Sequence, residues 1–488
     1  MCTARFTRLA AHRRMRRPSP PFLIVAFIGL AACRSSGGVA LPAADAIVEG
    51  RVAASVVTDT IEDDATVRID KGRWTLRSQN TPMGDFWADI AMLDLVSAEK
   101  AARSFDERTF AVALKKLMAS NPEDAAIAFQ ALHLNATDPT VRSRARIGLT
   151  MALSWQSDWP ALAGIGADPD SSDLADSSAV QAGVERWGRA LSLVPVPRIE
   201  VPIDPVTLPL RRSAFGTPVV TVSINGHPHE FWLDTGASMT LLSDEVAVAS
   251  GVRLAARDTL ALGVVAGHIP ARAVFIDSLS LGPMTARGLG AALVNKGALR
   301  MDHKVVNGMR QSVQIDGVIG TDLLRHLDLV IDANASTITI KRPRRDPRAV
   351  RNLFWVGYPV VRLVTKDGRP ALFGLDTGAE GTYITTSLLR KQPKTPVAMR
   401  RGSIGGLGAE QHATQWVARQ LALSDGDYAI ELKNVPVAPE RRWTFVNFDG
   451  VLGSDIALAS RMHLDFVNGV FDVRKPTSGN GITVTVGH

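Results

Sequence analysis

The sequence predicts a multidomain fold in which an α-helical N-terminal region is followed by two mostly-β lobes. Its 488 residues exceed the ~100–200 of one ordinary domain. Apolar residues recur at helical spacing from about residue 85 to residue 188, and the region after residue 212 carries one set of motifs twice. With 46% hydrophobic and 21% charged residues, the composition is ordinary for a globular protein.

The first 32 residues are typical of an export signal. They hold six arginines and no acidic residue, and the apolar run at 22–32 is too short to span a membrane as a mature helix. The run ends in Leu30-Ala31-Ala32-Cys33, which resembles the lipobox of bacterial lipoproteins. That resemblance implies that residues 1–32 are a cleaved signal peptide and that lipidated Cys33 anchors the protein in the bacterial cell envelope. Arg34 favours the outer membrane, facing the periplasm, while a plain secretory leader and a signal anchor are the alternatives.

Charge and cysteine content exclude several classes of function. The six arginines of the leader account for six of the seven net positive charges, so residues 33–488 carry only +1 and no nucleic-acid partner is expected. Cys2 and Cys33 are the only cysteines, and Cys2 would leave with the leader. The mature monomer can therefore form no disulfide, and its stability must come from core burial.

Residues 33–84 are predicted to form a tether with a short β-like segment, residues 85–194 a helical domain, and the proline-rich residues 195–211 a linker. Three helix starts are signalled, by Ser104 with Glu107, by Asn121-Pro122 and by Asp138-Pro139. The hairpin at 121–155 resembles a tetratricopeptide-type repeat, which implies a protein partner. A generic helical domain is the alternative, because an array needs about three repeats.

The rest of the chain is built twice, as lobe 1 at 212–341 and lobe 2 at 353–477, with a basic linker at 342–352 and a C-terminal tail at 478–488. Three motifs recur in the same order: Thr217-Pro218-Val219-Val220 as Tyr358-Pro359-Val360-Val361, residues 231–237 as 373–379, and residues 316–323 as 449–456. Turn signals at Asn225-Gly226 and Asp367-Gly368, between β-branched runs, predict hairpins in both lobes.

Each copy places Asp-Thr-Gly-Ala at the end of a predicted strand, at 234–237 and at 376–379. Each also carries an apolar-apolar-Gly strand downstream, Val318-Ile319-Gly320 and Val451-Leu452-Gly453. This combination resembles the retropepsin-like aspartic peptidases, with the acid-protease fold and two lobes fused in tandem as in the pepsins. The resemblance covers residues 212–476 and implies a two-fold arrangement that brings Asp234 and Asp376 together around one water.

The resemblance also implies the chemistry. Two carboxylates ~3 Å apart cannot both ionise, so they share a proton, and the pair can activate water against the peptide bond of a peptide or protein substrate. Thr235 and Thr377 are expected to hydrogen-bond across the pair, and Gly236 and Gly378 to direct amides at the carboxylates. No metal or organic cofactor is expected, and the histidines at 227 and 229 lie in a hairpin that does not suit a metal site.

Glycine-rich runs occupy the place of the family's flaps, and their marker residues are Gly263, Gly267, Gly405 and Gly406. They are expected to close over a bound peptide strand, with plain hairpin turns as the alternative.

Pepsin-type sites carry Ser or Thr where this chain has Ala237 and Ala379, so we expect a less acidic pH optimum than that of pepsin. Glu380 is expected either to add a third charge near the pair or to face solvent.

Asp322 and Asp455, although duplicated, are predicted to be helix caps.

The leading functional prediction is an envelope-tethered aspartic endopeptidase whose helical region recruits substrates or inhibits the lobes. The alternatives are a non-catalytic peptide-binding module and a scaffold lipoprotein with a helical interaction domain.

Overall fold

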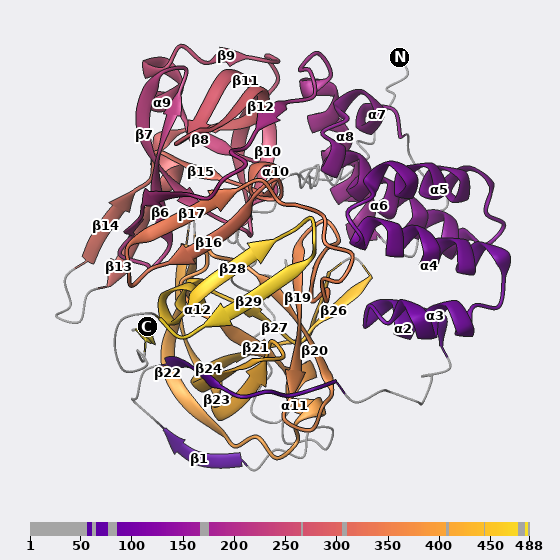
Figure 1. Ribbon diagram of the computed structural model, residues 1–488, viewed down its shortest axis with the longest axis vertical. Helices are drawn as coiled ribbons and strands as arrows, with labels where there is room; N and C mark the ends of the chain where they lie inside the picture. Colours follow the sequence, from indigo (N-terminus) through magenta and orange to yellow (C-terminus); the bar gives the residue numbers. More distant parts are fainter. Residues whose placement is uncertain are drawn as a thin grey trace, which may run out of the picture.

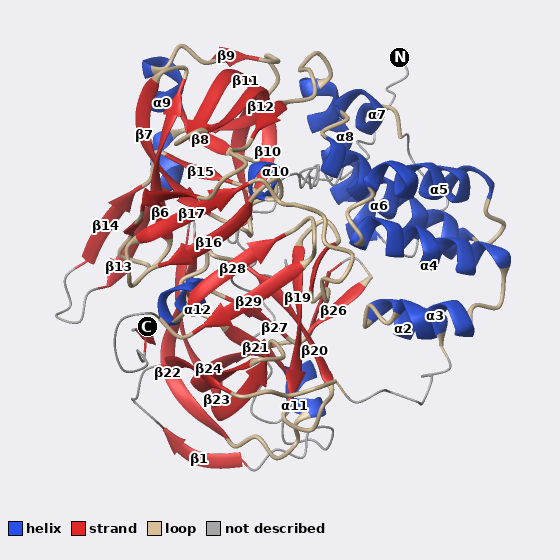
Figure 2. Cartoon of the chain, viewed as in Figure 1, coloured by secondary structure: helices blue, strands red, loops and turns tan. Residues whose placement is uncertain are grey.

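The computed structural model of the chain describes residues 56–60, 65–76, 85–165, 175–264, 267–304, 310–406, 409–443, 445–476 and 484–486. The predicted signal peptide and Cys33 lie outside these residues. Two β units are stacked in the view of Figure 1, and the helical region lies beside both of them. Figure 2 shows that the longer helices are gathered in this one region. No helix in the described ranges is both long and apolar enough to cross a membrane.

Three helices of the helical region begin where the sequence predicts. Its helices are α2 (Phe86–Ala91), α3 (Leu95–Ala101), α4 (Phe105–Met118), α5 (Pro122–Asn135), α6 (Pro139–Gln156), α7 (Trp159–Ala163) and α8 (Ala175–Leu191). Ser104, Asn121 and Asp138 each accept a hydrogen bond from a backbone amide in the first turn of α4, α5 and α6, respectively, which confirms the three predicted starts. In the core, Phe110 meets Phe129 edge to face at 5.5 Å.

The first β unit is built around one sheet. In order across the sheet the strands are β10 (Leu260–Val264), β11 (Gly267–Leu281), β12 (Met284–Val294), β8 (Leu241–Ser243), β15 (Gly317–Ile319), β7 (His227–Leu233), β6 (Pro218–Ile224) and β5 (Arg211–Arg212). The short strand β3 (Arg198–Glu200) pairs with β12, and β9 (Arg253–Leu254) pairs with β11. Strands β13 (Arg300–Lys304) and β14 (Arg310–Gln314) form a separate hairpin. Its helices are α9 (Asp244–Ala249) and α10 (Thr321–Leu324).

The second β unit repeats this plan. Across its sheet the strands are β1 (Val56–Thr60), β22 (Val397–Gly406), β23 (Ala409–Ser424), β19 (Pro359–Thr365), β20 (Pro370–Leu375), β27 (Gly450–Leu452), β21 (Tyr383–Thr385), β24 (Tyr428–Ala438), β2 (Ala65–Lys71) and β30 (Val484–Val486). Strand β18 (Leu353–Trp355) pairs with β19, and β25 (Arg441–Trp443) and β26 (Val446–Phe448) form a hairpin. Its helices are α11 (Thr386–Lys391) and α12 (Ser454–Ala459).

The duplicated motifs take up equivalent positions in the two sheets. Strand β7 pairs in parallel with β15, and β20 pairs in parallel with β27. In both sheets, therefore, the strand that leads into the Asp-Thr-Gly-Ala motif lies next to the strand of the downstream motif. The hairpins β6–β7 and β19–β20 turn at Asn225-Gly226 and Asp367-Gly368, as predicted, with both glycines at positive φ. The repeat in the sequence therefore corresponds to a repeat in the structure.

A third sheet joins the two units. Its order is β29 (Val470–Arg474), β28 (Arg461–Asp465), β16 (Asp328–Asp332), β17 (Thr337–Lys341) and β4 (Val206–Pro209). Strand β16 of the first unit pairs antiparallel with β28 of the second, which sets the buried Leu329 opposite the buried Leu464. Backbone hydrogen bonds and apolar burial thus fix the units against each other.

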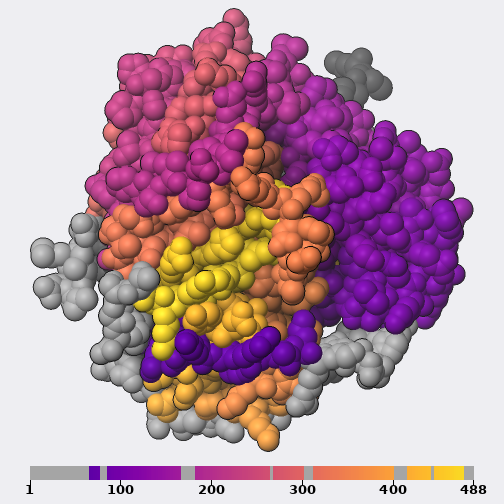
Figure 3. Space-filling model, in the orientation of Figure 1, coloured from indigo at the N-terminus to yellow at the C-terminus, as the bar shows by residue number. Residues whose placement is uncertain are grey.

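The segment before the helical region belongs to the second unit. Strand β2 lies between β24 and β30, and its Val67 and Ile69 are buried. Its indigo strip crosses the surface of the second unit in Figure 3. The short β-like segment predicted within residues 33–84 therefore supplies a strand to this sheet.

The helical region packs on both β units. On the second unit, Trp155 of α6 meets Trp355 at 4.7 Å and Phe110 of α4 meets Phe445 at 5.8 Å. On the first unit, the Trp187 indole of α8 donates a hydrogen bond of 3.2 Å to the Ala261 carbonyl in β10. These contacts hold the helical region against both β units.

Candidate active site

Both motif aspartates lie at the ends of strands, and the parallel pairings fix their backbones. The Asp234 amide donates to the Ile319 carbonyl at 3.1 Å, and the Asp376 amide donates to the Leu452 carbonyl at 2.9 Å. The duplicated downstream strands β15 and β27 are thus the direct supports of the two aspartates. The sequence predicted that the Asp-Thr-Gly-Ala and apolar-apolar-Gly motifs belong to one site. The strand register gives the reason, because each downstream strand pairs directly with the strand that ends at the aspartate.

The two threonines tie the motif loops to each other. The Thr235 amide donates to the Thr377 hydroxyl, and the Thr377 amide donates to the Thr235 hydroxyl, both at 3.0 Å. The Thr235 hydroxyl donates to the Leu375 carbonyl at 2.9 Å, and the Thr377 hydroxyl donates to the Leu233 carbonyl at 2.7 Å. These four buried hydrogen bonds form a reciprocal link that places the loops face to face.

Each carboxylate accepts two backbone amides of its own loop. Asp234 Oδ1 accepts from Gly236 at 2.7 Å and from Ala237 at 3.2 Å, and Asp376 Oδ1 accepts from Gly378 at 3.1 Å and from Ala379 at 3.0 Å. The two amides orient each carboxylate through its Oδ1 atom, and the second oxygen can interact with other groups.

The glycines let the carboxylates approach each other. A Cβ atom on Gly236 would lie 2.5 Å from Asp376 Cγ, and one on Gly378 would lie 2.4 Å from Asp234 Cγ. Each carboxylate is therefore packed against the glycine of the opposite loop. The structure brings together all six residues that the sequence singled out around the pair: Asp234, Thr235, Gly236, Asp376, Thr377 and Gly378.

Burial and mutual repulsion control the charge of the pair. The side chains of Asp234 and Asp376 are both buried. Burial, and next the charge of Asp376, raise the pKa of Asp234 well above its usual value, although the amides of Gly236 and Ala237 oppose the shift. The arrangement therefore suits two carboxyl groups that share one proton.

A tyrosine that the sequence analysis did not select lies beside the pair. Tyr358 is buried, and burial together with the nearby Asp376 raises the pKa of its hydroxyl well above the usual value. A signal for it exists in the sequence. Counting back from the hairpin turn at Asp367-Gly368 pairs Val364 with Pro370, and further counting reaches Tyr358 opposite Asp376.

The duplicated Asp322 and Asp455 are not helix caps, so that prediction is wrong. The caps of α10 and α12 are Gly320 and Gly453, and each aspartate lies inside the first turn. Asp322 accepts from the amide and hydroxyl of Thr240, both at 2.9 Å, and Asp455 accepts from those of Thr382 at 2.8 and 2.6 Å. They fix the chain that follows each motif loop, and burial raises the pKa of Asp455 to about 6.

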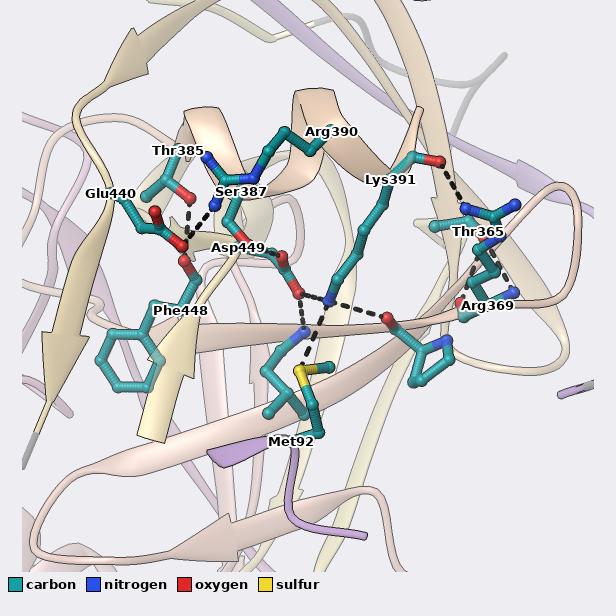
Figure 4. A network of polar contacts seen from close by, with 12 residues as sticks. Met92, Thr365, Arg369, Thr385, Ser387, Arg390, Lys391, Glu440, Phe448 and Asp449 are labelled. Carbon is teal, nitrogen blue, oxygen red and sulfur yellow. Dashed lines mark hydrogen bonds and ion pairs between the residues drawn. The ribbon is translucent and has the colours of Figure 1, made fainter. Parts of the chain in front are cut away.

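The second unit contains a buried ion pair at the duplicated Asp-Gly-Val motif. Figure 4 shows the Lys391 ammonium reaching the Asp449 carboxylate, at 2.5 Å. Asp449 also accepts from the Leu372 amide at 2.8 Å and from the Ser387 hydroxyl at 2.9 Å. The pair therefore links α11 and β20 to β27, the strand that supports Asp376.

The glycine-rich runs form the tips of two hairpins. Gly263 and Gly267 lie in β10 and β11, where Val264 pairs with Gly267, and Gly405 and Gly406 end β22, which pairs with β23. Glu380 is half-buried, and its carbonyl accepts from the Ser454 hydroxyl at 3.0 Å.

A family profile covers the part of this site that contains the first motif. Residues 220–323 match the profile of a family described as Aspartyl protease. A similar solved structure is that of a retropepsin-like aspartic protease from Rickettsia conorii, at 16% identity and a TM-score of 0.19, covering 30% of this chain and 94% of that chain. No curated protein matches the chain. The matched residues include the Asp234 motif, so the chain contains a segment similar to aspartyl proteases.

Proposed function

We propose that the protein is an aspartic endopeptidase in which Asp234 and Asp376 activate one water molecule. The observation that carries this proposal is the packing of each buried carboxylate against the glycine of the opposite motif loop. The profile match to aspartyl proteases, which covers the first motif, supports the class of reaction.

The proposed reaction uses the one proton that the pair shares. The ionised carboxylate takes a proton from water while the water oxygen attacks the peptide carbonyl, and the protonated carboxyl hydrogen-bonds to the developing oxyanion. Collapse of the tetrahedral intermediate breaks the C–N bond, and the leaving nitrogen receives a proton from the pair. One water is consumed, an acid and an amine are produced, and the pair returns to its singly protonated state.

The pKa shift of Asp234 leads to an expected pH dependence. Because burial and Asp376 raise this pKa, Asp234 keeps its proton to a higher pH than an isolated carboxyl would, and the singly protonated pair persists toward neutral pH. We expect cleavage of a mixed peptide library by the chain from residue 34 onward to be fastest above about pH 4. A pH profile that peaks well below that value contradicts the expectation.

The hairpins that hold Gly263, Gly267, Gly405 and Gly406 are proposed to close over a bound peptide strand. Paired strands with glycine-rich tips can bend and can add backbone hydrogen bonds to an extended substrate.

The helical region is proposed to contact a protein partner. The exposed apolar side chains Phe105, Ile127 and Leu134 on α4 and α5 support this, and crosslinking in intact envelopes is the measurement.

The chain is further proposed to be a lipoprotein of the bacterial envelope, anchored by Cys33 and facing the periplasm. The support is the lipobox-like Leu30-Ala31-Ala32-Cys33 behind an apolar run. We expect Cys33→Ser to move the protein from the membrane fraction to the soluble fraction and to abolish labelling by radioactive palmitate. Unchanged labelling of the variant would refute the anchor.

A further inference from the structure

We propose that Tyr358 is a positioning residue whose hydroxyl donates to the Asp376 carboxylate, so that Asp376 acts as the ionised base and Asp234 carries the shared proton. This inference rests on the proposed peptidase function, and it assigns different roles to two aspartates that the internal repeat makes otherwise alike.

The strand register places one residue opposite each aspartate. Val360 pairs with Gly374 in the β19–β20 hairpin, and continuing this ladder sets Tyr358 opposite Asp376. Val219 pairs with Trp232 in the β6–β7 hairpin, which sets Thr217 opposite Asp234 in the same way. Cβ atoms of directly opposed residues lie about 4.5–5.5 Å apart, so each side chain is a neighbour of its aspartate.

The second unit has made room for the larger side chain. A Cβ atom on Gly374 would lie 2.7 Å from Tyr358 Cε1, so the phenol ring occupies the space that any other residue at 374 would need. The equivalent position in the first unit is Trp232. The Tyr358 ring also lies 6.0 Å from the ring of Phe448, which helps to fix its orientation.

The phenol is the difference between the two halves of the pair. Both carboxylates accept two amides from their own loops, and both are buried. Opposite Asp234 stands the short Thr217 side chain, which carries no aromatic ring. Opposite Asp376 stands a phenol long enough to reach toward the carboxylate.

The charge around the pair agrees with this division of roles. A phenol has an ordinary pKa of about 10, and burial with Asp376 raises that of Tyr358 further, so the hydroxyl keeps its proton and acts as a donor. A donor favours the charged form of the carboxylate that it faces. The other titratable side chains that act on Tyr358 are Asp234 in the opposite loop and Tyr383 of β21.

The test is Tyr358→Phe, which removes the hydroxyl and keeps the ring. The chain has three tyrosines, and Tyr428→Phe, in β24, is the matched control. Two properties are measured in each variant: the pH profile of peptide cleavage, and the titration of the pair by NMR with 13Cγ-labelled aspartate, assigned with Asp234→Asn and Asp376→Asn.

We expect Tyr358→Phe to move the acidic limb of the profile, and the lower of the two titration steps of the pair, up by about one pH unit. Cleavage on that limb then falls about 10-fold, while the alkaline limb and the Tyr428→Phe profile stay where they are. Unchanged limbs and titration steps in Tyr358→Phe overturn the inference and leave the peptidase proposal intact. If the wild type cleaves nothing, the peptidase proposal fails, and the NMR titration alone still decides whether Tyr358 acts on Asp376.

Discussion

Asp376→Asn is expected to abolish peptide cleavage, with kcat reduced by at least about 10³-fold, because an amide can neither take a proton from water nor share one with Asp234. The side chain keeps its shape, and its Oδ1 can still accept from the Gly378 and Ala379 amides. The variant should therefore fold. Single-turnover cleavage of a peptide library, with circular dichroism as the check on folding, measures both properties.

A matched control for this variant is Asp258→Asn, which changes an exposed loop aspartate in the same way. We expect it to cleave at the wild-type rate. Unchanged cleavage by Asp376→Asn would show that the two aspartates of one chain do not work as a pair. A wild-type chain that binds peptides without cutting them would favour the peptide-binding alternative.

Lys391→Met is expected to lower the stability of the second β unit by about 3–5 kcal/mol, because it leaves the Asp449 carboxylate buried without its cation. Asp449 is fully buried and the Lys391 side chain is 20% exposed, so water cannot replace the ammonium. The Leu372 amide and the Ser387 hydroxyl remain as donors, but they do not neutralise the charge. The shift of the urea unfolding midpoint measures the effect.

The control for this stability effect is Lys296→Met, which breaks the more exposed ion pair with Glu245 in the first unit. A surface pair contributes about 0–1 kcal/mol, so its midpoint should barely move. In a Lys391→Met chain, adding Asp449→Asn should recover part of the loss by removing the unpaired charge. Equal shifts for the two lysine variants would contradict the importance of burial.

The features that could be predicted from the sequence are those encoded locally or twice. Ser104, Asn121 and Asp138 mark helix starts through contacts within one turn, and Asn225-Gly226 marks a hairpin through the φ values that it tolerates. The repeated motifs predicted a paired site because chance does not duplicate three of them in order. Each of these signals spans only a few residues of chain.

The features that could not be predicted depend on pairings between distant segments. No local signal in 65–71 says that this strand will enter a sheet formed by residues after 353. The capping prediction for Asp322 failed because its partner, Thr240, lies 82 residues away in the chain. Helix-capping rules consider only residues within the same helical turn. Tyr358 was missed although hairpin arithmetic reaches it, because the repeat directed attention to residues that the copies share and Tyr358 replaces a threonine.

The position of β2 constrains when the protein can finish folding. This strand is made early in synthesis, yet its neighbours in the sheet are β24 and β30, and β30 ends at residue 486. The sheet of the second unit therefore cannot be completed until residues 484–486 have left the ribosome, although domains generally fold one after another from the N-terminus. Contacts between such distant segments form slowly, so closure of this sheet is expected to be a late step of folding.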